Sequence, residues 1–573
     1  MIKSLNQLQM KWISFMRKTC VMLITGLFIY AGGGKHVYAS NSHPATTQSE
    51  QDKARQTALK PMEQEYTPGS IYTGEKMLKF PEESVCKYIN DVVIESDDAA
   101  LTRRMLGKLT AQAKSRCLGI NGIQLLAHAL QNELIARGYI TSLIDIPSQD
   151  MANGILILTL VYGRVGEIAY NAKTENDETR LWNTMPTSSD NILNLKDLEM
   201  GMANLQRLPG TSAHMKLQPG KQYGETDIVI TRKLDKMWQL GAWLDDAGSR
   251  ASGRYQGGAA LYLYDLTTLD DILYLAAGGD VEYQQKNDGN HNSSLYYSVP
   301  FGYWNLSVYA SHSTYLQQFR GNYSTVDYES KNRYYSATLE RLISHTRDQK
   351  TSLSARVSKS RSRYYFGGEE LMVMRKQNPA WELGVRHQHY FNKKIVDAGI
   401  TMQHRLGWLS STPTPEEKAG LYNKQARVVR ADIKALMKFN NTGEKFAWAP
   451  HFSLQISPDT LSSDNLFNIG NRWSVRGFDG ESTLSSNQGW YLRNDFIWNI
   501  PTPDQQFYVG LDAGKIIGSD RYQSGKVLSG AVVGLRGEKL ATQYDLFIGT
   551  PLVKPESYHT DALNMGFSLQ WRY

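Results

Sequence analysis

The amino-acid sequence predicts a transmembrane antiparallel β-barrel of about 16 strands, preceded by two small domains that mix strands with helices. Three observations lead to this prediction. The chain has 573 residues, too many for one compact core, and it begins with an export signal. Two similar stretches of strand and helix signals follow. From residue 236 onward, apolar and polar residues alternate with the period of a β-strand.

Residues 1–39 have the pattern of a secretory signal peptide. They hold five basic residues and no acid, an apolar run covers residues 19–31, and residues 37–39 form a small-residue cleavage pattern. The run is shorter than the roughly 20 residues that a membrane-spanning helix needs. Subtracting those five charges from the net charge of +7 leaves +2 for the rest of the chain. The charge is therefore mostly a targeting signal and does not indicate a nucleic-acid partner.

Residues 40–79 are polar and contain one candidate helix. A capping-box pattern at residues 47–50 precedes helix-forming residues that continue to Lys60, and Pro61 ends the run. This helix would be polar on nearly every face, so it cannot pack on an apolar core. Two interpretations stay open: a helix lodged in a wet cavity, or a disordered linker.

Residues 80–162 alternate strand and helix signals in the order β-α-α-β-β. The clearest element is the second helix, for which Asn121 is the expected N-cap and residues 123–134 carry an apolar stripe at helical spacing. Residues 163–235 repeat the order, with a helical stripe that Pro209-Gly210 ends. Two similar small domains are therefore expected in tandem.

Residues 236–573 have the pattern of membrane-spanning strands, clearest where Phe567, Trp571 and Tyr573 share one face of the last strand. An open sheet of this size would expose an edge and a large apolar face, so the soluble alternatives are sandwiches or propellers. The export signal, strands of about 9 to 11 residues, and recurrent Tyr and Trp favour a barrel with a wet interior. At roughly 21 residues per strand and loop, the region provides about 16 strands.

Cys86 and Cys117 are the two cysteines that follow the signal peptide. In an exported and therefore oxidising setting, a disulfide that closes a loop of about 30 residues is the favoured interpretation. Two buried thiols or half of a metal site are the alternatives, but no cluster of His or Cys completes a metal site in the sequence.

No standard catalytic signature is present. The sequence contains no H-E-x-x-H, no G-x-S-x-G and no complete Walker loop. The acid pairs Asp245-Asp246 and Asp270-Asp271 are interpreted as turn or loop residues instead of a general acid and base. The sequence thus supports no enzymatic activity and no cofactor.

Two segments in the last third of the barrel differ from ordinary strands and loops. The first is Val475-Arg476-Gly477-Phe478, and the second is a strand with Gly510, Asp512 and Gly514 on one face. A carboxylate facing lipid would be costly, so this face is expected to line the lumen. Arg476, at the tip of an inward-folded loop, could then form a bidentate bond to Asp512. The alternative is that Arg476 lies in an extracellular turn and Asp512 is one lumenal charge among several.

On these motifs the chain resembles the TpsB outer-membrane transporters of two-partner secretion, in the haemolysin secretion and activation class. The resemblance runs from the signal peptide to Tyr573. Four segments carry it most specifically: residues 117–121 with 136–141, the Arg207-Leu208-Pro209-Gly210 turn, the V-R-G-F segment at 475–478 and the F-x-x-G-x-D-x-G segment at 507–514.

The resemblance implies an N-terminal plug helix within residues 40–79 and two periplasmic POTRA domains, at 80–162 and 163–235. It also implies a 16-stranded barrel at 236–573 and an inward-folded loop whose tip the barrel wall holds. The residues it assigns to roles are the gating tip Val475, Arg476, Gly477 and Phe478; the wall partners Gly510, Asp512 and Gly514; the passenger-recognition region Arg207, Leu208, Pro209 and Gly210; and the terminal assembly signal Phe567, Trp571 and Tyr573.

The function implied by the resemblance is export of an unfolded partner exoprotein of the TpsA type, which could be a haemolysin, an adhesin or a contact-dependent inhibition toxin. Outer-membrane lipid and the barrel assembly machinery are the other expected partners, and the protein is expected to work as a monomer. Two rivals are a barrel-assembly factor that inserts client barrels and a passive porin. The first tends to have more POTRA repeats, and the second explains neither repeat.

Overall fold

The computed structural model places most of the chain after residue 77. The described residues are 55–57, 59–60, 63, 77–171, 180–249, 253–281, 289–320, 325–391, 394–407, 418–439, 445–501, 505–518 and 526–573. The predicted signal peptide at 1–39 lies outside them, as does most of the candidate helix segment at 40–79.

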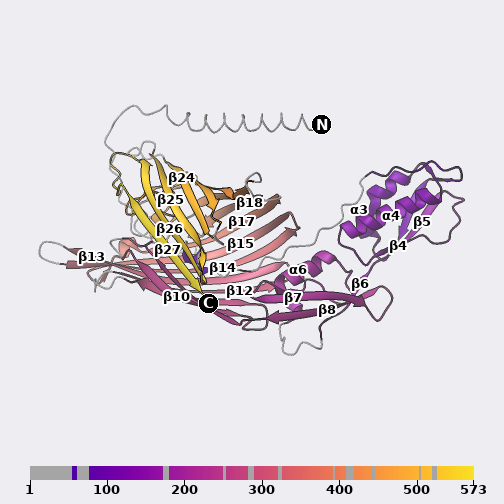
Figure 1. Cartoon of the computed structure of the whole chain (residues 1–573), viewed down its shortest axis with the longest axis horizontal. Coiled ribbons are helices and arrows are strands. Elements are labelled where there is room, and N and C mark those ends of the chain that lie inside the picture. The colour runs from indigo at the N-terminus through magenta and orange to yellow at the C-terminus, as the bar shows by residue number, and fades with distance from the viewer. Residues whose placement is uncertain are drawn as a thin grey trace, which may run out of the picture.

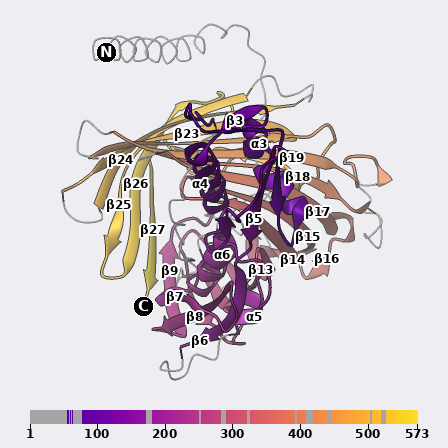
Figure 2. The same ribbon diagram turned by 90° about the vertical axis from the view of Figure 1, so that its right-hand side faces the viewer.

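A large barrel and two small domains make up the described structure. Figure 1 shows the second small domain, with α6, beside one end of the barrel strands and the first, with α3 and α4, farther out. In Figure 2, which faces that end, the small domains lie in front of the barrel.

The first small domain has a three-stranded sheet and two helices. Its elements are β1 (Lys87–Ile89), β2 (Asp91–Glu95), α3 (Ala99–Thr110), β3 (Arg116–Leu118), α4 (Ile120–Ala136), β4 (Leu143–Asp145) and β5 (Ile155–Val161). The sheet order is β2-β5-β4, while β1 and β3 pair separately. The apolar stripe of α4 packs on the sheet, with Leu126, Leu130 and Leu134 fully buried in a common core with Leu156 and Leu158.

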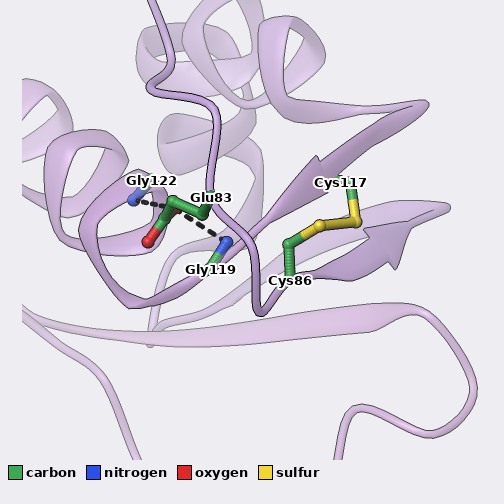
Figure 3. The surroundings of a disulfide bond; sticks show 5 residues. All are labelled: Glu83, Cys86, Cys117, Gly119 and Gly122. Carbon is green, nitrogen blue, oxygen red and sulfur yellow. Dashed lines mark hydrogen bonds between the residues drawn. A yellow bond between two sulfur atoms is a disulfide. The ribbon is translucent and has the colours of Figure 1, made fainter.

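Helix α4 begins differently from the sequence-based prediction. Its N-cap is Gly119 and not Asn121, because the cap is supplied from outside the helix. The Glu83 carboxylate accepts hydrogen bonds from the backbone N–H groups of Gly119, Asn121 and Gly122, each at 2.9 Å. Figure 3 shows those from Gly119 and Gly122. Partial desolvation raises the pKa of Glu83, but these donors outweigh it, so the pKa lies below its ordinary value.

A disulfide bond joins Cys86 to Cys117 beside this cap, with 5.3 Å between the Cα atoms (Figure 3). It ties the chain that carries Glu83 to the segment that leads into α4. The disulfide therefore holds the Glu83 cap against the N-terminus of α4.

Replacing both Cys86 and Cys117 by serine is expected to loosen the first small domain by about 3 to 4 kcal/mol, because the closed loop of 31 residues is released in the unfolded state. Hydrogen exchange of the α4 amides in the full chain measures the free energy of opening. The single variant Cys86→Ser should match the double variant, because either change removes the bond. Unchanged protection in both would contradict the expectation.

The second small domain repeats the α/β arrangement. Its elements are β6 (Arg164–Tyr170), α5 (Leu181–Thr184), α6 (Leu195–Leu205), β7 (Thr211–Pro219) and β8 (Glu225–Leu234). The sheet order is β6-β8-β7, with β6 parallel and β7 antiparallel to β8. Leu198, Met202 and Leu205 of α6 pack with Ile228 and Ile230 of β8.

The rest of the chain forms a closed antiparallel barrel. In chain order its strands are β9 (Trp238–Asp245), β10 (Gln256–Tyr264), β11 (Ile272–Asp280), β12 (Gly289–Phe301), β13 (Trp304–Arg320), β14 (Thr325–His345), β15 (Gln349–Phe366), β16 (Glu369–Glu370), β17 (Lys376–Phe391), β18 (Lys394–Arg405), β19 (Arg427–Lys438), β20 (Phe446–Ile456), β23 (Gln488–Asn499), β24 (Gln505–Ile517), β25 (Lys526–Lys539), β26 (Thr542–Val553) and β27 (Asn564–Arg572). Since β15 also pairs directly with β17, the two-residue β16 adds no wall strand, and sixteen strands of the described chain close where β27 meets β9.

The barrel presents its apolar residues outward. Along β13 to β15, the side chains of Leu306, Leu339 and Val357 are exposed, while Tyr309 and Ser336 on the alternate face are buried. Outward apolar residues on a closed barrel have no protein partner and suit lipid surroundings, so the barrel spans a membrane. The fold class predicted from the alternation is confirmed.

Among the described helices, none is both long and apolar enough to cross a membrane.

Candidate functional site

The candidate site is the inside of the barrel, where the long connection between β20 and β23 folds back. This connection covers residues 457–487 and includes the short strands β21 (Phe467–Ile469) and β22 (Leu484–Ser486), which pair with each other. Its tip, Val475 to Phe478, is buried, and the side chains of Val475, Arg476 and Phe478 are each no more than 5% exposed. The tip is therefore not an extracellular turn.

Arg476 is fixed to the barrel wall by two carboxylates. Its Nε and Nη2 atoms donate to Oδ2 and Oδ1 of Asp512 on β24, at 2.7 and 2.9 Å, and its backbone N–H also donates to Asp512 at 3.1 Å. Its Nη2 atom pairs with Asp495 on β23 at 2.5 Å. Arg536 reaches the other oxygen of Asp495 at 3.3 Å. The two parallel hydrogen bonds between the Arg476 guanidinium and the Asp512 carboxylate make this contact directional as well as strong.

Glycines in the wall make room for the tip. A Cβ atom on Gly510 would lie 2.5 Å from Nη2 of Arg476, and one on Gly514 would lie 2.8 Å from Val475. Gly477 itself has a φ of +96°, a backbone conformation that favours glycine. The alternating face of Gly510, Asp512 and Gly514 is thus the surface on which the tip rests.

Apolar contacts complete the seat of the tip. Val475 and Phe478 belong to one buried cluster with Leu528 and Tyr558, and the ring of Phe478 meets Tyr558 edge-on at 5.5 Å between centroids. The side-chain amide of Asn564 donates to the Gly477 carbonyl at 2.9 Å. The loop is held over a broad surface, and Arg476 lies at its centre.

A helical segment near the N-terminus also lies in the lumen. Residues 55–57 and 59 are helical, and Leu59 is buried in a cluster with inward-facing tyrosines such as Tyr262. The Tyr262 hydroxyl donates to the Leu59 carbonyl at 3.1 Å. Arg55 and Leu59 line a cavity of about 270 Å³ that Arg476 also lines. The described part of the segment is therefore a helix in a polar cavity and not a linker.

The segment after this helix is tied to the second small domain. The Glu63 carboxylate lies 2.9 Å from Nη2 of Arg207, which also donates to Ser298 of the barrel at 2.7 Å. Burial raises the pKa of Glu63, but the nearby cations, Arg207 foremost and then Lys60 and Lys350, together outweigh it, so the pKa lies below its usual value. Helix segment, small domain and barrel thus meet at Arg207.

The Arg207-Leu208-Pro209-Gly210 turn lies at this junction, and half of it is buried there. Arg207 and Leu208 are buried, and Leu208 shares the apolar cluster of Leu59. Only Gly210 of the four is exposed and Pro209 is half-buried. In this state Arg207 and Leu208 face the junction and are not open to a passenger.

The second small domain docks on the turns at one end of the barrel. Arg232 of β8 pairs with Asp265 at 3.2 Å and with Asp270 at 2.5 Å, both in the turn between β10 and β11. In the turn between β12 and β13, the Gly302 carbonyl accepts from Asn204 at 2.9 Å. Because this domain precedes the barrel in the chain and contacts these turns, they mark one common end of the barrel.

The last strand closes the barrel. β27 pairs with β9, and the backbone N–H of Tyr573 donates to the Leu240 carbonyl at 2.9 Å. Trp571 and Tyr573 are exposed on the outer face and stack at 6.1 Å between ring centroids, while Phe567 is half-buried. These residues lie at the seam where first and last strands join.

Three residues that form ion pairs at the site or at the junction were not identified from the sequence. Asp495 lies on the inward face of β23, opposite the exposed Phe496 and Trp498, so strand alternation could have found it. Glu63 and Arg232 depend on contacts between distant segments, and no local pattern marks them. Asp270 does lie in a turn, as expected, but there it holds a buried ion pair.

These features define a class of protein: outer-membrane β-barrel transporters that carry small periplasmic domains and keep a lumenal helix and an inward-folded loop inside the barrel. The family described as haemolysin secretion/activation protein ShlB/FhaC/HecB matches residues 224–537, and POTRA domain families match residues 89–163 (ShlB-type) and 164–219. The chain belongs to this haemolysin secretion/activation family.

Known relatives agree with this membership. The chain is 30% identical to the outer membrane transporter CdiB-2 of Burkholderia pseudomallei, over 80% of this chain and 79% of that one. It is 25% identical to the hemolysin transporter protein ShlB of Serratia marcescens, over 70% and 71%. The solved structure of CdiB from Acinetobacter baumannii matches with a TM-score of 0.80 at 25% identity, covering 92% of this chain and 99% of that one. The predicted family is confirmed, and the protein is an outer-membrane transporter of two-partner secretion with its POTRA domains in the periplasm.

Proposed function

We propose that this transporter exports an unfolded exoprotein encoded beside it, and that the lumenal helix and the loop tip must move before the passenger can cross. The observation that carries the proposal is the double anchoring of Arg476 to Asp512 and Asp495 inside the barrel. The anchored tip and the helix at the buried Leu59 both lie inside the barrel, so the path of the passenger is obstructed in the resting state. Export then requires a change of conformation.

The passenger is recognised by the small domains through their sheet edges. In the described sheets, β2 and β4 flank the first domain, and β6 and β7 flank the second. An edge strand offers unpaired N–H and C=O groups to an extended segment, which gives affinity with little demand on sequence. Gly210, which is exposed and immediately precedes the edge strand β7, lies beside such an edge.

In this proposal the transporter catalyses no reaction, works as a monomer and needs no cofactor. The polar lumen keeps an extended backbone solvated, so the passenger needs no dehydration, and folding outside makes its export irreversible. The seam residues Phe567, Trp571 and Tyr573 serve as the signal read by the barrel assembly machinery. In this proposal residues 1–39 direct export, residues 40–79 form the plug segment, residues 80–162 and 163–235 form the two POTRA domains, and residues 236–573 form the barrel.

Co-expression with the neighbouring exoprotein gene tests the function. We expect the exoprotein in the culture medium with the transporter, and retained in the periplasm without it. Client barrels that misassemble on deletion, with exoprotein export unchanged, would identify an assembly factor. Small-solute conductance without any export would identify a porin.

A further inference from the structure

We infer that the outer face of the barrel at β14 and β15 binds the phosphate groups of an outer-leaflet glycolipid. The site is a basic cluster that consists of Lys331, Arg333, Lys359, Arg361 and Arg363. Nothing in the export mechanism uses these residues, since they lie on the outer face and not in the lumen.

The alternation of the strands places the cluster outside the barrel. On β14, exposed Leu339 and Tyr335 occupy odd positions, and Arg333 continues the same face. On β15, exposed Leu353 and Val357 set the outward face, which Lys359 continues. Successive residues of one face lie about 7 Å apart along a strand. The cations thus begin directly where the apolar band ends.

The cluster lies at the level of the outer leaflet. The second small domain, which is periplasmic, contacts the turn at Gly302 that leads into β13. Trp304 and Arg341, which are paired across β13 and β14, mark that periplasmic end. Lys331 and Arg333 lie toward the opposite end of β14, and Tyr335 stands between the band and the cations as an interfacial aromatic.

The pairing of the strands brings like charges together. Arg333 is directly opposite Arg361, and Lys331 is directly opposite Arg363. Such pairs repel one another on a sheet surface unless an anion lies between them. Phosphate is the anion that suits this arrangement, because a guanidinium binds it with two parallel hydrogen bonds.

The protein itself only partly neutralises the cluster. Lys331 pairs with Glu329 at 2.9 Å, and Arg363 lies 3.9 Å from Glu370. Across the described residues, Arg333, Lys359 and Arg361 have no ion-pair partner. In the same part of the chain, the Nε atoms of Arg361 and Arg363 are buried without a hydrogen-bond acceptor. Donors that are withdrawn from water and left unpaired favour a ligand that is missing from the protein alone.

A membrane lipid is the occupant that this position favours. A cation near the bilayer surface is attracted to anionic headgroups, and its cost on a barrel surface is small there and large only at the bilayer midplane. The outer leaflet supplies phosphates on acyl-chain anchors at this height, and those chains would cover the apolar residues below, such as Val357. A soluble anion would leave that band uncovered.

The test compares lipid binding by the purified full chain in detergent. The probe is bisphosphorylated lipid A, and binding is measured by titration and by native mass spectrometry of the retained lipid. The triple variant Arg333→Gln/Arg361→Gln/Arg363→Gln is expected to bind about tenfold more weakly or worse. Arg341→Gln is the matched control, an outward cation on the same strand at the periplasmic end, and should bind like wild type.

Each other outcome overturns the assignment. Equal binding by wild type and triple variant would show that the cluster holds no lipid. Full displacement by inorganic phosphate would show a free-anion site in place of a lipid site. Normal lipid binding by the triple variant, together with impaired exoprotein export, would show that the surface serves the passenger. Because export is measured separately, failure here leaves the transport function standing.

Discussion

Replacing Arg476 by alanine is expected to lower export of the partner exoprotein about tenfold or more, while the amount of folded barrel stays near wild type. The variant leaves Asp512, which is 2% exposed, and Asp495 without their central counter-charge. Breaking a buried ion pair in this way costs about 3 to 5 kcal/mol. The tip then no longer rests on the wall, and it occupies the path of the passenger in many orientations.

The measurement is the ratio of secreted to total exoprotein, normalised to the heat-modifiable barrel in the outer membrane. Arg386→Ala serves as control, because Arg386 also forms a forked ion pair with a lumenal aspartate, Asp397, but this pair is more exposed, joins neighbouring wall strands and does not involve the loop. Arg476→Lys should recover only part of the export, since an ammonium keeps the charge but loses the fork. Wild-type export by a well-expressed Arg476→Ala protein would refute the gating role.

The wall side of this site was accessible from the sequence pattern. Alternation along one strand placed Gly510, Asp512 and Gly514 together, and a lumenal carboxylate implied a cationic partner. For Arg476, spacing left an inward-folded loop and an extracellular turn open, and the family resemblance pointed to the loop. Only the position of the wall residues follows from a short-range pattern, whose physical cause is the two-residue repeat of a strand.

The junction between the small domains and the barrel was not accessible in this way. The family resemblance assigned Arg207 to passenger recognition, whereas its burial against Ser298 and Glu63 depends on how three distant segments pack, which no local pattern shows. The predicted N-cap of α4 was wrong because of such a long-range contact: Glu83, more than 30 residues earlier in the chain, replaces the local side chain. Local patterns predict elements, whereas such contacts are set by tertiary packing.

The junction at Arg207 leads to the second prediction, that Glu63→Ala raises the frequency of channel opening roughly fivefold to tenfold. Glu63 comes a few residues after the lumenal helix, and its ion pair with the nearly buried Arg207 joins this segment to the second small domain, beside the apolar contact of Leu59 with Leu208. A hydrogen bond to a charged group is worth about 1.5 to 3 kcal/mol, a range that allows a helix to be held and yet released. Without the pair, the helix leaves the lumen more often.

Single-channel recordings of the full chain in planar bilayers measure this opening. Removal of residues 40–60 should give a still larger conductance, because it takes away the helix itself and not only its fastening. Glu133→Ala is the matched control, since it removes a carboxylate that pairs with Arg137 on α4, away from the barrel. If the deletion opens the channel and Glu63→Ala does not, the helix blocks the pore but Arg207 does not hold it. If neither changes the current, the helix rests in the lumen without closing it, and the loop at Arg476 alone keeps the channel shut.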